Sequence, residues 1–459
     1  MKSTSFPVLD RRRCGVLLHP TALGDGGGAL GAAGREFVDW LAAARFSVWQ
    51  VLPLGPVGDD GSPYWSRADG AWNIHLIDWR EAPPMGEMAA EFAVFKRDNA
   101  AWLDDYVLFE ALSSEQEQAP WWQWTTPLRE RAPDALREVQ QRLAPALERA
   151  RYEQWVAALQ WARLRRHAHT RGVRLFGDLP IYVAPDSATV WSQREQFQLD
   201  ATGRALAVAG VPPDYFSAEG QLWGNPLYHW PQAQRDGFAL WRQRLQWMLQ
   251  RFDLVRIDHF RGLCACWAVP ATAASARQGS WQPTPGYELL QSLGKAFGQL
   301  PLVAEDLGVI TADVVALRRA FDLPGMRVLQ FGFDGNGANP HLPHEHERAT
   351  IAYSGTHDNN TTLGWFRMLD AVTRERVTDY AGSEMAAMPL PLLRLVLASV
   401  AQLAILPMQD LLGLGGEARF NTPGTTPGNW SWRLPAGSLN DELARHWAAL
   451  NRVYGRADS

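Results

Sequence analysis

Short apolar runs recur eight times along this chain, and amphipathic stretches separate most of them. The runs are rich in β-branched residues and are bounded by Gly, Pro or Asp, as buried strands are. They are Gly15–His19, Val48–Leu54, Val173–Val183, Leu254–Phe260, Leu302–Asp306, Met326–Phe331, Thr350–Ser354 and Leu403–Met408. Helical patterns lie between them at Arg35–Ala44, Glu153–Thr170, Leu240–Gln250, Tyr287–Phe297 and Ala312–Ala320. This alternation predicts an α/β protein with a (β/α)8 TIM barrel rather than an open sheet.

Two intervals between the predicted strands are too long to be simple crossovers. Residues 67–150, after the second strand, are rich in helix formers, Trp and acids, and they predict an inserted helical subdomain. Residues 184–239, after the third strand, hold many Gly, Pro, Asp and aromatic residues, and they predict a loop-rich inserted subdomain. Because both follow a strand, we expect both at the C-terminal rim of a single catalytic domain spanning 1–459.

Composition excludes several classes of partner. The net charge of −5 offers no basic field for nucleic acid or anionic lipid. The sequence contains no run of eighteen apolar residues and no apolar signal segment at its start, so we expect no membrane contact and a cytoplasmic location. The 22 tryptophans are unusual; most are expected in the core, but such rings also stack well on sugars.

Three acidic residues stand at the ends of three predicted strands: Asp258, Glu305 and Asp358. A retaining glycosidase needs two carboxyls about 5–5.5 Å apart, and neighbouring strands lie about 4.8 Å apart. Asp258 and Glu305, on the fourth and fifth strands, fit that separation. Arg256 lies two residues before Asp258 on the same strand face, so it is expected to keep Asp258 ionised. A drier site would raise the pKa of Glu305 toward that of a proton donor.

The spacing of the acids alone leaves an aldolase or a metal-dependent hydrolase open beside sugar chemistry. A metal site would need converging His and carboxylate ligands, and His341, His344 and His346 form one candidate cluster. Their Pro- and Asn-rich surroundings favour a solvated loop. Cys264 and Cys266 are better explained as inert thiols than as a metal or redox pair.

Ten segments in one order resemble the amylomaltases, the 4-α-glucanotransferases of glycoside hydrolase family 77. The resemblance runs from about Gly15 to Leu434. The segments are Leu17–Thr21, Ser62–Tyr64, Gly177–Ala184, Gly210–Ser217, Gly220–Pro226, Arg256–Gly262, Ala304–Gly308, Thr356–Asp358, Asn421–Gly424 and Gly428–Trp430. The chain departs from the common pattern at Trp65, where Gln is usual, and at Asn360, where Asp is usual.

The resemblance implies a role for each acid. Asp258 would be the nucleophile, Glu305 the general acid/base, and Asp358 the third carboxylate, which grips sugar hydroxyls and stabilises the transition state. It also implies substrate-binding roles for Tyr64, Asp214, Gln221, Trp223, Asn225, Arg256, His357 and Asn429.

The implied reaction transfers a segment of a 1,4-α-glucan to the 4-hydroxyl of glucose or another glucan, with retention, through a covalent glucosyl-enzyme. No metal or organic cofactor is expected, and the expected partners are maltooligosaccharides and other α-1,4-glucans. Two other functions stay open: an α-amylase-like retaining hydrolase, with water as acceptor, and a catalytically inactive glucan-binding protein. The second would be expected to lack one of the three acids, and all three are present.

Overall fold

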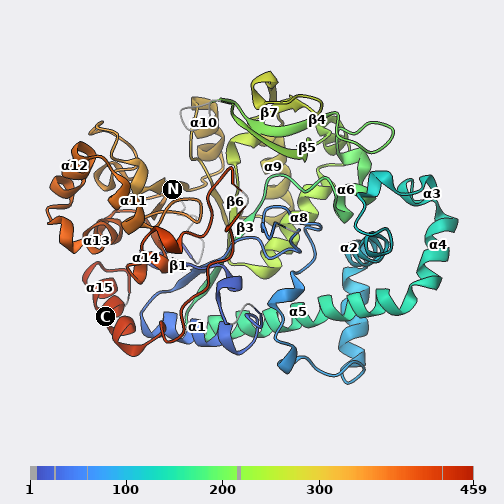
Figure 1. Cartoon of the computed structure of the whole chain (residues 1–459), viewed down its shortest axis with the longest axis horizontal. Coiled ribbons are helices and arrows are strands. Elements are labelled where there is room, and N and C mark those ends of the chain that lie inside the picture. The colour runs from blue at the N-terminus through green and yellow to red at the C-terminus, as the bar shows by residue number, and fades with distance from the viewer. Residues whose placement is uncertain (1–7, 25–26, 59, 214–218, 426, 458–459) are drawn as a thin grey trace.

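A barrel of eight parallel strands forms the centre of the molecule (Figure 1). The computed structural model describes residues 8–24, 27–58, 60–213, 219–425 and 427–457. The strand order is β10-β11-β12-β1-β2-β3-β6-β9. The two ends of this sheet meet where the N–H of Ala304 donates to the carbonyl of Pro324 at 2.9 Å. The barrel strands are β1 (Arg13–Leu17), β2 (Val48–Gln50), β3 (Arg174–Leu179), β6 (Leu254–Ile257), β9 (Leu302–Ala304), β10 (Gly325–Val328), β11 (Thr350–Tyr353) and β12 (Leu403–Pro407).

Each of the eight predicted strands coincides with one barrel strand, so the predicted (β/α)8 barrel is confirmed. Every predicted run extends past the carboxyl end of the observed strand. Strand β6 ends at Ile257, whereas the predicted run continues to Phe260. His259 has a left-handed backbone (φ 49°), which ends the ladder and turns the chain across the barrel mouth. The residues past each strand therefore line the rim instead of pairing.

Helices surround the barrel, and several of them bury an apolar stripe. In α9 (Gly286–Phe297) the stripe is Leu289, Leu290 and Leu293, spaced as one helix face requires. The other long outer helices are α1 (Ala32–Ala43), α8 (Ala239–Arg251), α10 (Ala312–Ala320), α12 (Ala371–Ala381), α13 (Leu390–Ala398) and α15 (Asp441–Val453). Short helices are α6 (Ala188–Ser192), α7 (Trp230–Arg235), α11 (Thr362–Met368) and α14 (Met408–Leu411).

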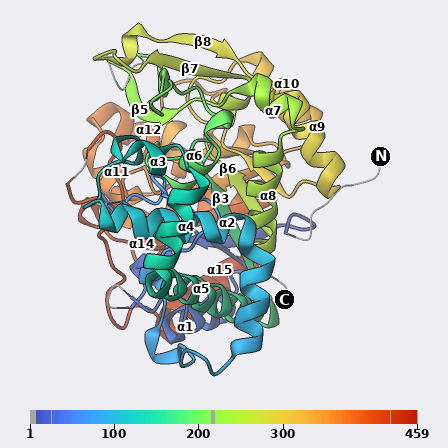
Figure 2. The ribbon, with the colours of Figure 1, turned by 90° about the vertical axis from the view of Figure 1, so that its right-hand side faces the viewer.

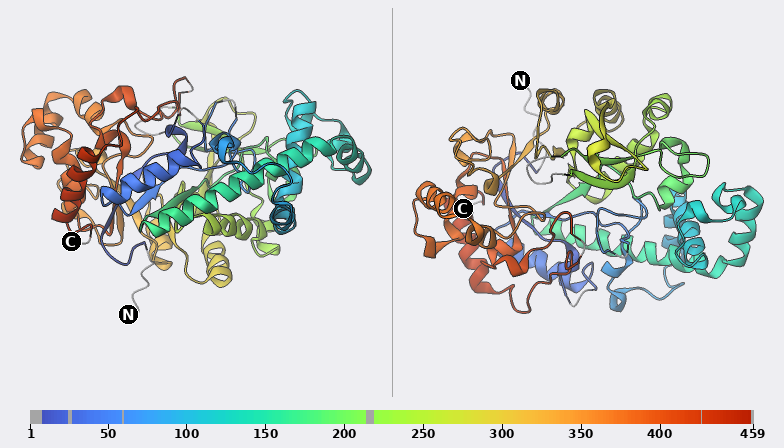
Figure 3. Two further views of the ribbon diagram at one scale, coloured as in Figure 1. Left: turned by 90° about the horizontal axis from the view of Figure 1, so that it is seen from below. Right: turned by 45° about the horizontal axis from the view of Figure 1, so that its top comes forward.

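The interval after β2 is helical in the structure. It contains α2 (Ala89–Glu115), α3 (Thr126–Arg129), α4 (Pro133–Arg142) and the first part of α5 (Ala144–Thr170). Helix α5 is one continuous rod that runs from the outlying helices to the base of β3 (Figure 3). The same helix therefore belongs both to the interval and to the barrel wall. The subdomain boundary at residue 150 stays a prediction.

A second sheet, antiparallel and four-stranded, covers one side of the rim, with order β5-β4-β7-β8. Strands β4 (Ala207–Val211) and β5 (Gln221–Pro226) come from the interval after β3, whereas β7 (Ala265–Pro270) and β8 (Ser280–Pro283) follow β6. Strand β4 pairs with β7, so two separate insertions share one sheet. The sequence prediction missed the part after β6, because β8 is exposed along its whole length and carries no apolar alternation.

The buried guanidinium of Arg456 ties the C-terminal segment to the base of the barrel. It donates to the carbonyls of Leu397 at 2.7 Å, Arg13 at 2.8 Å and Ser399 at 2.9 Å. Leu397 and Ser399 lie at the end of α13 and Arg13 at the start of β1, so one side chain satisfies acceptors from two parts of the chain.

Replacing this side chain is expected to weaken the fold without changing the site. Arg456→Met should lower the free energy of unfolding by about 2–4 kcal/mol, because the buried carbonyls lose a charged donor. Urea denaturation measures this. Arg452→Met, on the exposed face of α15, is the matched control and should be near neutral. Equal stability of the two variants would contradict the assigned role of Arg456.

Candidate active site

The guanidinium of Arg256 organises the mouth of the barrel. On β6, Arg256 pairs in register with Asp178 at the end of β3. It donates to both oxygens of Asp178, at 2.8 and 2.7 Å, and to Asp258 Oδ1 at 2.9 Å. The Tyr64 hydroxyl accepts from Arg256 at 2.9 Å and donates to Asp178 at 2.6 Å. Four side chains, from the ends of β3 and β6 and from the loop after β2, are therefore held as one polar cluster.

Asp258 and Glu305 lie on adjacent strand ends. Ile257 pairs with Ala304, the residue before Glu305, and the Glu305 N–H donates to the Ile257 carbonyl at 3.1 Å. Both oxygens of Glu305 accept backbone N–H groups, from His259 at 2.8 Å and from Leu307 at 3.0 Å. Because neighbouring strands lie about 4.8 Å apart, the backbones that carry the two acids have about the separation that retaining glycosidases need between their carboxyls.

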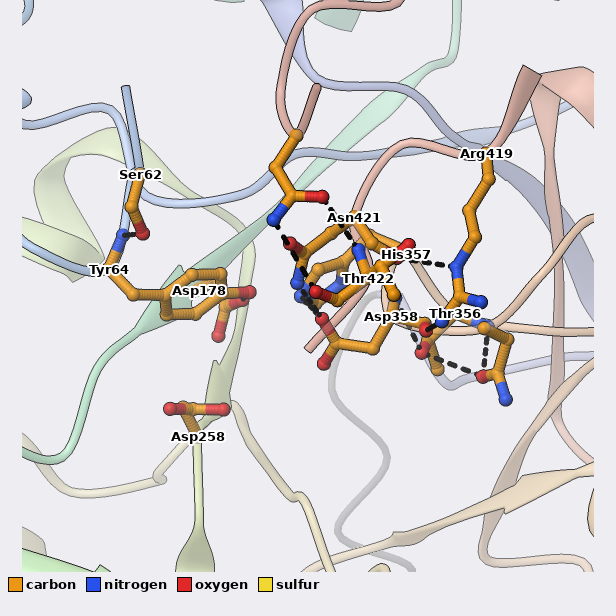
Figure 4. A network of polar contacts seen from close by, with 12 residues as sticks. Ser62, Tyr64, Asp178, Asp258, Thr356, His357, Asp358, Arg419, Asn421 and Thr422 are labelled. Atoms are coloured by element: carbon orange, nitrogen blue, oxygen red, sulfur yellow. Dashed lines mark hydrogen bonds and ion pairs between the residues drawn. The ribbon is translucent and has the colours of Figure 1, made fainter. Parts of the chain in front are cut away.

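Asp358 stands in the turn after β11, and its carboxylate points toward the side of the site where Asp258 lies (Figure 4). Asn421 donates to Asp358 Oδ1 at 2.6 Å, and Arg419 donates to its backbone carbonyl at 2.6 Å. Half of the Asp358 side chain (46%) stays exposed, and so does 29% of that of Asp258. Each of the two carboxylates is therefore held by a hydrogen bond from the protein and is also partly accessible to a ligand.

Aromatic rings form one wall between these acids. The rings of Tyr64 and His357 are stacked, with centroids 5.3 Å apart and planes 14° apart. Trp430 lies 6.1 Å from each of them. Burial lowers the pKa of His357, so its ring is neutral at pH 7 and its Nε2 lies 3.4 Å from Asp358. A flat, uncharged wall of this kind suits the apolar face of a sugar ring.

Burial also changes the titration of the acid pair. It raises the pKa of Glu305 to about 7, against the opposing effects of Arg256 and two backbone N–H groups. It raises the pKa of Asp258 above its usual range as well; Arg256 opposes that rise, and the charges of Asp178, Glu305 and Asp358 add to it. Arg256 thus does less for Asp258 than the sequence suggested, because it is shared with Asp178.

Four further residues predicted to bind substrate lie in two parts of the structure. Gln221, Trp223 and Asn225 are on β5, and Asn429 is in the C-terminal loop. Trp223 lies on β5 with its ring edge-on to His259, 4.8 Å between centroids, and its indole donates to Gln221 at 3.1 Å. Asn225 is buried and donates to the Val183 carbonyl at 2.8 Å.

Asn429 lies in the C-terminal loop beside Trp430. Its amide oxygen accepts from the Thr422 N–H at 2.9 Å and its amide nitrogen donates to the Thr425 carbonyl at 2.7 Å. The side chain thus folds the loop that carries Asn421. Asp214 lies outside the described residues.

The sequence analysis missed three functional candidates: Asp178, Asn421 and Trp430. Asp178 lies in the middle of the predicted run Val173–Val183, and only the observed end of β3 at Leu179 shows that it stands at the barrel mouth. Asn421 and Trp430 stand in a loop without periodicity; the family-like segments Asn421–Gly424 and Gly428–Trp430 include them, and their contacts with Asp358 and His357 give them a role.

A metal centre has no support in the part of the chain that the structure covers: no three His, Cys, Asp or Glu residues there converge as ligands. The three histidines of the candidate cluster bind other groups of the protein instead. His341 accepts from the Val328 N–H, His344 contacts Tyr380, and His346 contacts Ser399. Among the described helices, none is long and apolar enough to span a membrane.

A closed (β/α)8 barrel with three carboxylates and an aromatic wall at the carboxyl ends of its strands defines a class: a carboxylate-dependent enzyme of the glycoside hydrolase type. The family model for 4-alpha-glucanotransferase, glycoside hydrolase family 77, matches residues 18–86 and 80–439. The chain belongs to this family. The family and the enzyme class expected from the sequence are confirmed, and neither alternative function is favoured.

Individual relatives cover nearly the whole chain. The 4-alpha-glucanotransferase of Thermus thermophilus is 43% identical over 96% of this chain and 98% of that protein. That of Synechocystis sp. is 43% identical over 98% of this chain and 99% of that protein. The solved amylomaltase of Streptococcus agalactiae in complex with acarbose has a TM-score of 0.93 and 32% identity, covering 98% of this chain and 100% of that one.

The bond between Asn421 and Asp358 can be tested directly. Asn421→Ala should lower kcat/KM for maltotriose about tenfold to hundredfold, because Asp358 loses a donor worth about 1.5–3 kcal/mol. The thermal midpoint should stay close to that of the wild type. Thr425→Ala, in the same loop but without a contact to Asp358, is the control. Wild-type kinetics in Asn421→Ala would mean that Asp358 does not depend on this amide.

Proposed function

We propose that this chain transfers a segment of a 1,4-α-D-glucan to the 4-hydroxyl of glucose or another glucan by a retaining double displacement. The observation that carries the proposal is the carboxyl pair Asp258 and Glu305 on adjacent strand ends, one bound to a guanidinium and the other raised in pKa to about 7. This is the division of labour that a retaining mechanism needs.

In the first displacement Asp258 attacks the anomeric carbon while Glu305 protonates the departing glycosidic oxygen. We place the proton of the pair on Glu305, because Asp258 accepts directly from a permanently charged guanidinium at 2.9 Å. Within the described part of the chain, Glu305 accepts from two neutral backbone N–H groups and no charged donor. The C–O bond to the leaving glucan breaks, and a covalent glucosyl-Asp258 ester forms.

Asp358, His357, Arg256 and Tyr64 are proposed to hold the sugar at the point of cleavage. The open side of Asp358 would accept two sugar hydroxyls, in bonds that tighten as positive charge develops on the ring. Tyr64 would stack under the ring, and the Arg256 cluster keeps both Tyr64 and Asp258 in place. Neutral His357 donates a hydrogen bond without adding charge.

In the second displacement Glu305, now ionised, removes the proton from an incoming 4-hydroxyl, which attacks the ester. Transfer exceeds hydrolysis when an acceptor sugar occupies the site and water is excluded. Trp223, Gln221 and Asn225 on β5, with Asp214 in the preceding segment, are proposed to form the acceptor side. Asn429 is proposed to act on the cleft through the loop it folds.

The proposed substrates are maltooligosaccharides and longer α-1,4-glucans, and the proposed location is the cytoplasm. No metal or organic cofactor enters the mechanism, since both displacements need only carboxyl groups and sugar hydroxyls. The S. agalactiae amylomaltase bound to acarbose supports a saccharide as the ligand of this cleft.

Removing the nucleophile should stop the reaction. Asp258→Asn should lower the turnover of maltotriose at least about 10³-fold, because the amide cannot form the glycosyl ester. The wild type should convert maltotriose to glucose and longer maltooligosaccharides, resolved by chromatography. Glucose and maltose alone would indicate hydrolysis instead, and full turnover by Asp258→Asn would refute the assignment of the nucleophile.

Protonation of Glu305 should set the alkaline limb of the pH profile. Because burial raises its pKa to about 7, the neutral acid persists up to that pH, and glucan cleavage should fall as pH rises beyond it. Glu305→Gln should lose maltotriose turnover yet still be glycosylated by α-maltosyl fluoride, whose leaving group needs no proton. The rate of that glycosylation should not fall as the pH rises through 7.

The raised pKa has a second consequence for stability. The folded state holds the Glu305 proton more tightly than the unfolded state, so this group's contribution is lost as pH rises from about 4.5 to about 7. Glu305→Gln should therefore unfold at a higher denaturant concentration than the wild type above pH 7. An equal or lower midpoint there would contradict the burial of an ionisable Glu305.

A further inference from the structure

The loop that carries Asp358 is bound at both of its ends by one buried carboxylate. This loop, residues 354–361, connects β11 with α11. At its start, the Ser354 hydroxyl donates to Asp410 Oδ2 at 2.6 Å. Just past its end, the Thr362 hydroxyl donates to the same oxygen at 2.6 Å, and the Thr362 N–H donates to Oδ1 at 2.7 Å. Asp410 therefore joins the two ends at the base of the loop.

Asp410 comes from the neighbouring strand of the barrel. It lies in α14, directly after β12, and β12 pairs with β11. Helix α14 lies near α11 in Figure 1 and in Figure 2. Ser354, Thr362 and Asp410 are each at most 2% exposed. Because a buried carboxyl group is stable only when hydrogen bonds replace its water, Asp410 constrains both loop ends. It is too buried to contact a substrate, so any effect on the reaction passes through the loop.

Hydrogen bonds inside the loop set the shape of its turn. The Asn359 side chain accepts from the N–H and the hydroxyl of Thr356, both at 2.9 Å. The Thr356 hydroxyl in turn accepts from the Asp358 N–H at 3.3 Å. These bonds join residues of the loop to one another, so they do not fix its position in the barrel mouth.

The position of the loop depends on contacts with other segments. Asn421 and Arg419 bind Asp358 itself, and Gln330 donates to the Asn360 carbonyl at 2.9 Å. Residues 419 and 421 belong to a segment without regular structure, whereas Asp410 follows a barrel strand. The bonds to Asp410 therefore tie the loop directly to the buried wall of the barrel.

We propose that Asp410 is a positioning residue that holds Asp358 at the point where the sugar is cleaved. This inference rests on the proposed function, in which Asp358 binds sugar hydroxyls in bonds that tighten in the transition state. A displacement of about 1 Å at such a group costs about a hundredfold in rate. Loosening the base of the loop should therefore slow the reaction more than it weakens binding of the substrate.

Asp410→Ala removes the acceptor of all three bonds. In the full chain it should lower kcat for maltotriose about tenfold to hundredfold and change KM by less than about threefold. It should also lower the thermal midpoint, because buried donors lose their acceptor. Arg456→Met is the control: it should lower the thermal midpoint and keep the wild-type kcat. A wild-type kcat in folded Asp410→Ala, with or without a higher KM, would overturn the proposal.

A double-mutant cycle shows whether Asp410 acts through Asp358. Glycosylation by α-maltosyl fluoride is the readout, because its reactive leaving group keeps weakened variants measurable. Asp410→Ala should slow this step about tenfold to hundredfold in the otherwise wild-type chain, and no more than about threefold in the Asp358→Asn chain, where the positioned carboxylate is already lost. Equal losses in the two backgrounds would mean that Asp410 acts independently of Asp358 and would overturn the proposal.

A milder variant decides the matter if Asp410→Ala does not fold. Ser354→Ala removes one bond at the strand end of the loop and leaves the two from Thr362. It should lower kcat about threefold to tenfold at a nearly unchanged KM, and a wild-type kcat would overturn the proposal. Failure of the wild type to rearrange maltotriose would refute the proposed function instead. The cycle reads only the first displacement, so it would still decide whether Asp410 positions Asp358.

Discussion

The guanidinium of Arg256 is buried at the barrel mouth, and its N–H groups contact Asp178, Tyr64 and Asp258. A buried cation is tolerated only when its partners stay in place, so these contacts constrain the strand ends that carry them. The parallel register of β3 and β6 puts Asp178 opposite Arg256, and the remaining contacts follow from that pairing. The positions of Asp258, the proposed nucleophile, and of the aromatic wall thus depend on one ion-pair cluster.

The sequence predicted those parts of the molecule that repeat a simple period. Eight apolar runs gave eight barrel strands, and acids placed after three of them, Asp258, Glu305 and Asp358, stand at the carboxyl ends of β6, β9 and β11. This works because strands of a closed parallel barrel all end on one face, so a residue just past a buried run is directed to the same mouth as the others.

Other parts could not be predicted, because their reason lies in contacts between distant segments. Strand β8 is exposed along its length, so it has no apolar alternation to recognise. Asn429 is polar in a loop, and the sequence alone does not reveal that its amide folds that loop by bonding the Thr422 N–H. The sharing of Arg256 between two carboxylates likewise requires the register of β3 with β6, which no local pattern specifies.

The antiparallel sheet beside the mouth consists of two pieces of chain, one inserted after β3 and the other after β6, joined by the β4–β7 ladder. Neither piece can complete its hydrogen bonding alone. If only one of them were exchanged with that of a homologue, β4 and β7 would no longer match where they pair. To transfer the proposed acceptor specificity between family members, both segments therefore have to be exchanged together. Strand β6, which ends just before Asp258, is therefore connected through β7 to the antiparallel sheet that carries Trp223.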